Sequence, residues 1–250
     1  MISPVFLNTC RIIYNRIVMS LKILYKKQPI LKSRKDINMV KFQTTENAVE
    51  TRIKNQKLVR KKHLLIASKA TKLFIKKGFS NTSMRDISRV TKITLGNLYS
   101  YIKRKEDILC LVFDLYHKTW VKTLEKNGVM EIDDPEQQIR RAVRAMMEFG
   151  EQYQDEIKLM HMESRFLPKE FLAVAKDNEK QLVNAFENMI RRGVERGIFR
   201  VEDPFFSANM LVFEMSLNSL RGWNLRDKYN YDEIVRMTEN YILDTLKKPA

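Results

Sequence analysis

A short stretch at residues 94–105 carries the side chains best suited to binding a polyanion. Thr94 is able to cap a helix formed by LGNLYSY, residues 95–101. Leu98 and Ile102 lie four residues apart, so we expect both to face inward. The residues expected on the outer faces are Leu95, Gly96, Asn97, Tyr99 and Tyr101. Small, polar and aromatic groups followed by three cations at 103–105 suit a helix lying in a groove of DNA.

A second short helix is expected immediately before this stretch. Thr82 or Ser83 is able to cap it, and Ser83 with Asp86 forms the S-x-x-D pattern of a capping box. Met84, Ile87 and Val90 recur every three residues and are expected to face inward. Residues 91–93 interrupt the period, which predicts a helix-turn-helix across residues 82–102.

Longer helices flank this pair. Residues 57–77 carry an apolar stripe ringed by lysines, of which Lys61 and Lys62 are expected within reach of phosphate, and Gly78 ends the helix. The stripe consists of Ile66, Ala70, Leu73 and Phe74. Residues 105–126 form a fourth helix whose first turn is acidic, as a positive helix terminus favours. We expect this fourth helix to act as a lever between the DNA-binding region and the rest of the chain.

Residues 67–109 resemble the DNA-binding domain of TetR/AcrR-type transcriptional regulators. The family's first helix ends in a phenylalanine followed by a glycine, as Phe74 and Gly78 do here. Its second helix carries an isoleucine before a small residue, as Ile87 and Ser88 do. The matches to the family's recognition helix are Thr94, Gly96, Leu98, Tyr99, Tyr101, Ile102, Lys105 and Glu106.

The resemblance implies roles for these residues. Thr94 and Asn97 would reach base edges or nearby phosphates, Gly96 would permit close approach, and Leu95 would touch a thymine methyl. Tyr99, Tyr101 and Lys105 would hold phosphates. The complete candidate DNA-binding set is Ser83, Thr94, Leu95, Gly96, Asn97, Tyr99, Tyr101, Lys103, Arg104 and Lys105.

Two residues depart from the family pattern. Lys92 replaces the glycine usual in the turn, so this position must tolerate a side chain. Arg104 replaces the usual small capping residue before the fourth helix, which predicts a weaker cap. Both departures add positive charge.

Composition favours an all-α protein. The 250 residues are 44% hydrophobic and include only seven glycines and six prolines, few for a loop-rich or all-β fold. Cys10 and Cys110 form no disulfide framework, which fits a reducing cytoplasm. The three histidines have no partner at ligand spacing, so no metal site is expected.

The positive charge is concentrated toward the N-terminus. Residues 1–60 carry 13 basic and 3 acidic side chains, and residues 61–109 carry 12 and 3. Residues 110–250 carry 21 and 24, so the whole excess of +16 lies within residues 1–109. This asymmetry indicates that the N-terminal part binds a nucleic acid.

Residues 1–38 admit three interpretations. They form a basic arm for DNA phosphates, an amphipathic helix that seeks a surface, or an artefact of a start codon upstream of Met39. Arg11, Asn15, Arg16 and Lys22 interrupt the apolar run, so neither a membrane span nor a signal peptide is expected.

The remainder of the chain predicts further helices at about 135–153, 155–166, 168–196, 203–225 and 231–247. Residues 135–166 are rich in flexible apolar groups that adapt to varied ligands or simply pack a core. The candidate effector residues are Met146, Met147, Phe149, Tyr153, Met160, His161, Glu163 and Phe213.

The last two helices are apolar on more than one face, which favours a homodimer through these helices. Trp223, between them, is expected to be a packing anchor.

These observations predict an N-terminal extension at 1–56, a three-helix helix-turn-helix domain at 57–104, and a larger helical effector-binding and dimerisation domain at 105–250.

The expected function is that of a cytoplasmic, ligand-responsive repressor that binds a palindromic operator as a homodimer. A small lipophilic effector, with an acyl thioester as one guess, would release it. No cofactor is expected, and an enzyme is disfavoured because no phosphate-cradling loop or nucleophile elbow occurs. The alternatives are a helical adaptor without specific operator binding and a basic membrane-surface protein.

Overall fold

The computed structural model describes residues 49–247, all of which belong to one compact unit, Asn38–Ala250. Every regular element in this range is a helix. The expectations about residues 1–38, including the three interpretations of the N-terminal extension, fall outside the described residues. No helix within residues 49–247 has the length and apolar character needed to cross a membrane.

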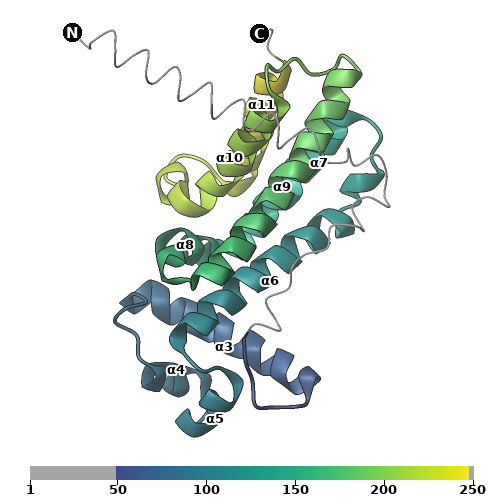
Figure 1. The fold of residues 1–250 in the computed structure, drawn as a ribbon. Helices are drawn as coiled ribbons and strands as arrows, with labels where there is room; N and C mark the ends of the chain where they lie inside the picture. Colours follow the sequence, from purple (N-terminus) through teal and green to yellow (C-terminus); the bar gives the residue numbers. More distant parts are fainter. Residues whose placement is uncertain (1–48, 248–250) are drawn as a thin grey trace, which may run out of the picture. The chain divides into compact units, whose positions relative to one another are not determined.

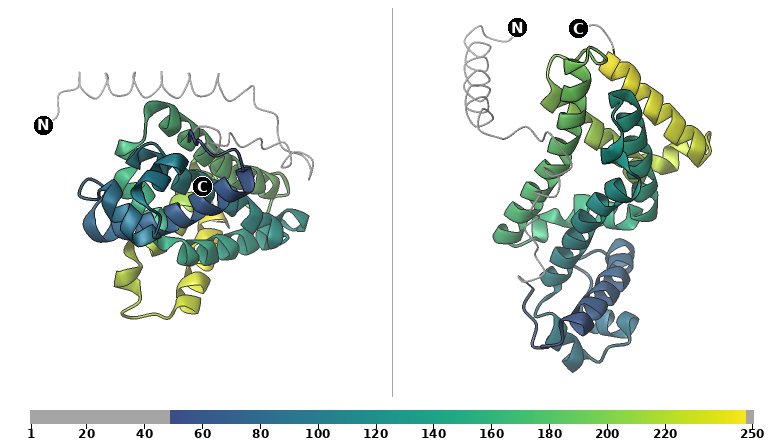
Figure 2. Two further views of the ribbon diagram at one scale, coloured as in Figure 1. Left: turned by 90° about the horizontal axis from the view of Figure 1, so that it is seen from below. Right: turned by 90° about the vertical axis from the view of Figure 1, so that its right-hand side faces the viewer.

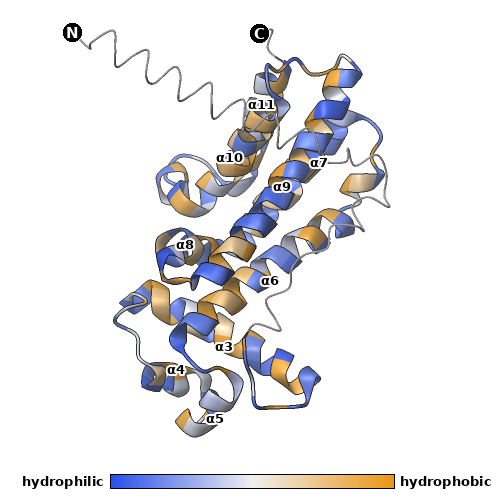
Figure 3. Ribbon diagram, viewed as in Figure 1, coloured by the Kyte–Doolittle hydropathy of each residue, from blue (hydrophilic) through white to orange (hydrophobic). Residues whose placement is uncertain are grey.

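Three helices form one end of this unit: α3 (Gln56–Lys77), α4 (Met84–Thr91) and α5 (Leu95–Tyr101). Figure 1 shows them grouped at the lower end of the long helix α6. Helix α3 carries both hydrophilic and hydrophobic residues along its length (Figure 3), and its buried residues from Val59 to Phe74 recur about every three or four positions, as expected for a helix with one buried side. These boundaries agree with those predicted from capping residues and apolar spacing.

Local capping accounts for where α3 begins and ends and for where α4 begins. The Asn55 side chain accepts a hydrogen bond from the Leu58 amide at 3.1 Å, which starts α3. Gly78 ends it with φ of 84°, a value that favours glycine. Ser83 and Asp86 form the predicted capping box of α4.

One position on α4 differs from the expectation. Val90 is 36% exposed, and Thr91 is buried in its place at 5%. Helical geometry explains the difference, because an inward line that starts at Met84 and Ile87 continues four residues later at position 91.

The remaining elements follow α6 (Lys105–Lys126) in the chain. They are η2 (Val129–Glu131), α7 (Pro135–Gln152), α8 (Gln154–Glu163), η3 (Ser164–Phe166), α9 (Lys169–Glu195), α10 (Pro204–Leu225) and α11 (Tyr231–Lys247). The segment predicted as one helix at 155–166 is therefore an α-helix that tightens into a 3-10 turn. The views of Figure 2 show α10 and α11 beside each other at the C-terminal end.

Two apolar cores hold these helices. The first core joins α3–α5 and the first half of α6 to the end of α8 and the start of α9; its members include Ile66, Phe74, Ile87, Leu98, Ile102, Ile108, Leu159 and Phe171. The second core fills the C-terminal helices; its members include Val129, Ile139, Val143, Phe186, Ile190 and Phe199. The cores meet inside α6, between Phe113 and Tyr116, whereas the sequence placed a domain boundary at 104/105.

Close packing in the second core depends on one glycine. A Cβ placed on Gly193 would lie 2.0 Å from the ring of Phe199, which is 1% exposed. Any side chain at position 193 would therefore displace this ring from the core.

Trp223 is not the packing anchor expected from the sequence, because it is 69% exposed. The buried line of α10 runs through Met215, Ser219 and Gly222. The next residue along the helix turns about 100° away from that line, which places Trp223 in solvent.

Candidate nucleic-acid interface

Helix α5 presents a polar outer face on an apolar base. Leu98 and Ile102 are both fully buried, as the spacing predicts, and anchor the helix in the first core. Thr94, Gly96, Asn97 and Tyr99 are exposed, and Leu95 is half-buried. This arrangement leaves a hydroxyl, an amide and a phenol on one short helix, where each is able to hydrogen-bond to a base edge or a phosphate.

Thr94 and Gly96 have features that suit contact with a partner. Thr94 occupies the N-cap of α5, but its side chain makes no capping hydrogen bond. A Cβ built on Gly96 would meet no heavy atom within 4 Å, so the fold itself does not require glycine there. The close approach of another molecule is a physical reason for glycine at this position.

Tyr101 does not lie on the outer face, which corrects the prediction from the sequence. It is 4% exposed and belongs to the first core. Its carbonyl accepts a hydrogen bond from Nε2 of the buried His63 at 2.8 Å. Tyr101 therefore fastens the end of α5 to α3 and does not present its ring to a ligand.

Lys105 also differs from its expected role. Its ammonium donates to the carbonyls of Phe79 at 2.5 Å and Thr82 at 2.9 Å, and lies 4.3 Å from the centre of the Phe79 ring. These partners belong to the segment between α3 and α4. In this arrangement Lys105 holds that segment against α6, and its charge is directed away from a phosphate on the outer surface.

The other two cations of this cluster are exposed and paired with acids. Lys103 forms an ion pair with Glu50, which lowers the pKa of that carboxyl through a hydrogen bond. Arg104 lies 3.3 Å from Asp107, and more than half of each basic side chain is exposed. Ion pairs with an exposed cation contribute little to stability, so both cations remain available to phosphates.

The start of α6 has a capping hydrogen-bond arrangement on one side only. One carboxylate oxygen of Asp107 accepts hydrogen bonds from the amides of Lys103 at 2.9 Å and Arg104 at 3.0 Å. These bonds are only the reciprocal half of a capping box, and the Arg104 side chain makes no capping hydrogen bond to the first amides of α6, so the weaker cap predicted from the sequence is confirmed.

Ser83 is exposed, and its hydroxyl is committed to the cap of α4. It receives a hydrogen bond from the Asp86 amide at 3.2 Å and donates to an Asp86 oxygen at 2.7 Å. This hydroxyl is the first cause of a depressed pKa for the Asp86 carboxyl, with Lys77 adding to it. Ser83 therefore positions α4, and any contact with DNA would be additional.

Three exposed cations near α5 extend the basic surface. Arg85 and Arg89 lie on the outer side of α4, and Lys92 follows in the turn. The sequence-based candidate set omits all three, although Arg85 and Arg89 lie opposite the apolar line of α4 at helical spacing. Lys92 has φ of 58°, so this lysine adopts the left-handed conformation that the family's usual glycine would favour.

The candidate effector residues are not gathered at one place. Met146, Met147 and Phe149 are buried in the second core, and Tyr153 stacks on Phe149 with 4.8 Å between ring centres. Met160 is half-buried and packs against both cores. His161 is exposed on α8 and Phe213 is 52% exposed on α10, so neither is buried in that cluster.

Glu163 lies at a junction between the two ends of the described unit. It is 8% exposed, and one of its oxygens accepts the Phe79 amide at 3.5 Å. The Phe79 ring lies 4.9 Å from Phe166 of η3 and 5.0 Å from Phe74 of α3. Helix α8 and the turn after it thus contact the segment that connects α3 to α4, which links some of the candidate effector residues to helices α3 and α4.

The described residues offer little support for a metal site or for a reactive thiol. Within residues 49–247, no three side chains of His, Cys, Asp or Glu are grouped so that they would hold a metal ion. Cys110 is buried, and burial raises the pKa of its thiol, which keeps it protonated and unreactive.

Comparison with known families covers both ends of the described unit. A family model described as "Bacterial regulatory proteins, tetR family" matches residues 66–110. A second model, "Tetracyclin repressor-like, C-terminal domain", matches residues 132–245. Together they span well over half of the chain.

Individual relatives agree with this assignment. The transcriptional regulator HbdR of Aromatoleum sp. (strain CIB) is 25% identical over 196 residues, which is 77% of this chain and 83% of HbdR. Among solved structures, AibR in complex with isovaleryl coenzyme A and operator DNA has a TM-score of 0.61 at 19% identity, over 76% of this chain and all of AibR. FadR from Bacillus subtilis in complex with stearoyl-CoA also scores 0.61, at 16% identity over 73% of this chain and 98% of FadR. The chain belongs to the TetR family of ligand-responsive, DNA-binding transcriptional regulators.

Proposed function

We propose that this regulator is a repressor that binds a palindromic operator as a homodimer and is released by a lipophilic acyl thioester. It acts in the cytoplasm and without catalysis. The observation that carries the proposal is the outer face of α5, where Thr94, Asn97 and Tyr99 stand exposed on a buried apolar base.

On this face, base contacts and phosphate contacts divide among different side chains. Asn97 and Thr94 read base edges, with the Leu95 side chain against a thymine methyl. Tyr99 holds a phosphate, and Lys103, Arg104, Arg85, Arg89 and Lys92 supply the surrounding positive charge. Tyr101 and Lys105 contribute indirectly, because they fix α5 and α6 in place.

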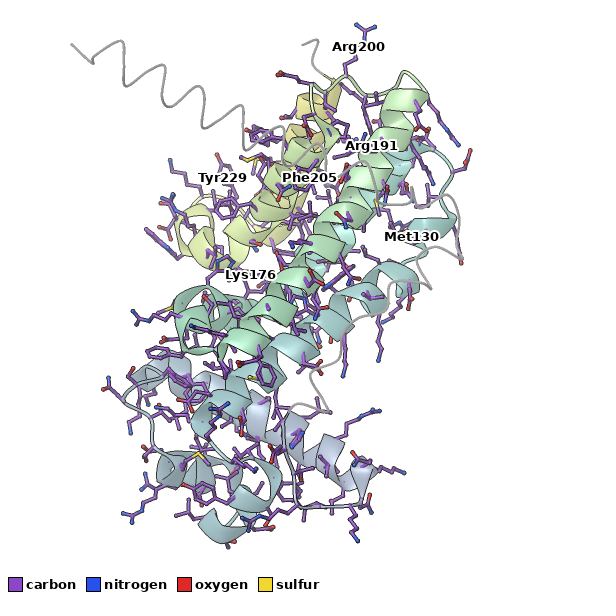
Figure 4. All side chains as sticks on the ribbon, viewed as in Figure 1. Met130, Lys176, Arg191, Arg200, Phe205 and Tyr229 are labelled. Atoms are coloured by element: carbon purple, nitrogen blue, oxygen red, sulfur yellow. The ribbon has the colours of Figure 1, made fainter. Side chains whose placement is uncertain are left out.

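An exposed apolar stripe on α10 supports the homodimer. The stripe consists of Phe206, Met210, Phe213 and Leu217, which are between 37% and 64% exposed and recur every three or four residues. Met237 and Tyr241 continue the exposed apolar surface on α11. Tyr229, labelled in Figure 4, lies in the turn between these helices and is 40% exposed. Two copies packed through α10 and α11 would bury this surface in a four-helix interface.

The effector binds in the apolar region around Met146, Met147 and Phe149 by displacing flexible side chains. Two structural neighbours, AibR and FadR, are described in complex with coenzyme A thioesters, which supports a ligand of this class. Movement of α8 passes to the DNA-binding helices through Glu163 and Phe166, because both contact Phe79. The effector needs only to bind the released arrangement better than the DNA-bound one.

The test is a gel shift of the full chain with DNA from its own upstream intergenic region, in excess competitor and at several salt concentrations. We expect a discrete, competitor-resistant complex of two chains on one palindrome, weakened by acyl thioesters. Asn97→Ala is expected to relax base preference at one position, whereas Tyr99→Phe is expected to weaken binding to all sequences. If selection of bound genomic fragments enriches no common site, the operator proposal is wrong.

A further inference from the structure

A small cavity lies between the middle of α6 and the first half of α9. Its lining comes from 110–117 of α6, from Leu167 before α9, and from 171–178 of α9. Its volume is about 10 Å³, close to the ~10–15 Å³ that a single water molecule requires. Ligand pockets have volumes of ~300–1,000 Å³, so this cavity is too small for an acyl thioester.

Two polar side chains interrupt an otherwise largely apolar wall. His117 of α6 and Asn178 of α9 both line the cavity, and each is 2% exposed. Neither ring nitrogen of His117 has a hydrogen-bond partner among the described residues, and the Oδ1 atom of Asn178 has none either. Because a buried polar group without a partner is costly, we expect the partner of both groups inside the cavity that they share.

His117 and Asn178 have complementary hydrogen-bonding groups that do not meet. Burial lowers the pKa of His117 to about 4, so near neutral pH its ring is uncharged, with one donor and one acceptor nitrogen. The Oδ1 atom of Asn178 only accepts hydrogen bonds. Since the two side chains line one cavity without a direct hydrogen bond, the cavity separates them.

The other groups in the lining that titrate are Asp114 and Cys110 of α6. The Asp114 carboxylate lies 2.7 Å from the Lys118 ammonium. The Cys110 thiol stays protonated, because burial raises its pKa. Neither residue supplies a hydrogen bond to the ring of His117 or to the Asn178 oxygen.

We propose that this cavity binds one ordered water molecule that bridges α6 and α9. The water donates a hydrogen bond to the Oδ1 atom of Asn178. It also bonds to one ring nitrogen of His117, accepting where that nitrogen carries the proton and donating where it does not. Buried waters with two to four such bonds are part of a protein's structure and are costly to remove.

The bridge lies where the two apolar cores meet. Phe113, one turn before His117 on α6, belongs to the first core, and Tyr116 belongs to the second. The Tyr116 ring lies 5.4 Å from the His117 ring and 5.1 Å from the ring of Phe149, a candidate effector residue. The water therefore holds α6, the helix shared by both cores, to α9 at their junction.

The first test is a crystal structure of the full chain near neutral pH, without DNA or added ligand, at a resolution that shows ordered waters. We expect one water within about 3 Å of both the Asn178 oxygen and a His117 nitrogen. A direct hydrogen bond between the two side chains, or no water between them, would overturn the proposal. Because neither DNA nor an effector is present, this result is independent of the operator and effector proposals.

A double-mutant cycle measures the bridge in solution. His117→Leu and Asn178→Leu each leave the other polar group and the water without one partner, so each is expected to lower Tm by roughly 2–12 °C. The variant with both changes leaves neither group unpaired. Its Tm is therefore expected to fall by less than the sum of the two single shifts.

The matched control is Lys176→Leu, which places a leucine on the exposed side of α9, at a residue labelled in Figure 4. Combined with His117→Leu, its shift in Tm is expected to be additive, because the two side chains share no partner. If the shifts of His117→Leu and Asn178→Leu add in the same way, no common water joins the two residues and the proposal is wrong.

Discussion

At the residue scale, the fold does not require the glycine at position 96, whereas the proposed close contact with DNA does. Nothing in the described structure lies within 4 Å of a Cβ at this position. Alanine favours a helix by about 1 kcal/mol over glycine, so Gly96→Ala is expected to leave the free protein unchanged or slightly more stable. The added methyl group would meet the DNA, and operator affinity is expected to fall by ~10-fold or more.

Denaturant unfolding and a gel shift on the same preparations measure both effects of the Gly96→Ala change. Ser68→Ala, on the exposed side of α3, serves as the control for a harmless substitution on a helix. Unchanged operator affinity in Gly96→Ala would show that α5 does not approach DNA closely at this residue.

A buried histidine makes stability depend on pH. His117 is 2% exposed, and neither of its ring nitrogens has a hydrogen-bond partner among the described residues. Burial lowers its pKa from 6.5 to about 4. The unfolded chain therefore binds this proton at a higher pH than the folded chain, and stability contributed by neutral His117 is lost as pH falls from about 6.5 to about 4.

The His117→Leu variant isolates this effect, because leucine has a similar volume and does not titrate. Between pH 7 and pH 4.5, the unchanged protein is expected to lose roughly 2–3 kcal/mol more unfolding free energy than the variant. Guanidinium unfolding at both pH values measures the difference, with Ser68→Ala on the exposed side of α3 as the control. If the unfolding free energy depends on pH in the same way in all three proteins, His117 is not the cause of the pH dependence.

At the scale of elements, the contact between η3 and the segment after α3 joins the two ends of the described unit. Phe166→Ala removes the ring that lies 4.9 Å from Phe79. Because Phe166 is only half-buried, the expected loss of stability is about 1–2 kcal/mol, below the ~3–5 kcal/mol of a fully buried phenylalanine.

Hydrogen exchange shows which residues of the Phe166→Ala variant lose stability. Amides of residues 78–83 are expected to exchange faster in Phe166→Ala, while those of α11 serve as an internal control and stay unchanged. Exchange that rises equally in α11 would indicate general destabilisation instead of a local junction.

The helices were predictable from the sequence because their causes are local. The capping pair Ser83 and Asp86 and the glycine at position 78 lie within a few residues of the boundaries they set. The inward direction of Leu98 and Ile102 likewise follows from spacing alone.

The two residues whose positions were predicted wrongly, Tyr101 and Lys105, are placed by contacts between segments that are distant in the chain. Tyr101 is buried in the first core, where its carbonyl bonds to His63 of α3, and the carbonyls that receive Lys105 belong to a different segment, the one between α3 and α4. No pattern within one segment contains this information, so the sequence predicted the polar face of α5 but not the burial of Tyr101 or the contacts of Lys105.

At the scale of the whole molecule, the exposed stripe on α10 determines the expected assembly. Met210→Asp with Phe213→Asp places two charges on surface that a dimer would desolvate. We expect this variant to be a folded monomer, since both side chains are already exposed in the single chain. Operator affinity should fall by ~10-fold or more, because two half-sites no longer bind together.

Sedimentation and light scattering of the double variant measure its mass in solution. Lys122→Asp, on the exposed side of α6, controls for the introduction of an acidic residue. A double variant that remains dimeric would place the interface elsewhere on the chain.

Helix α6 has a consequence for building chimeric regulators. Its first half supplies 108–113 to one core and its second half supplies Tyr116, Trp120 and Leu124 to the other, with no glycine or proline between them. A splice within this helix would mismatch side chains in both cores at once. A chimera with a new operator preference should therefore exchange residues 83–102 and retain α6 whole, together with the Lys105 side chain, which holds the segment immediately before the exchanged residues.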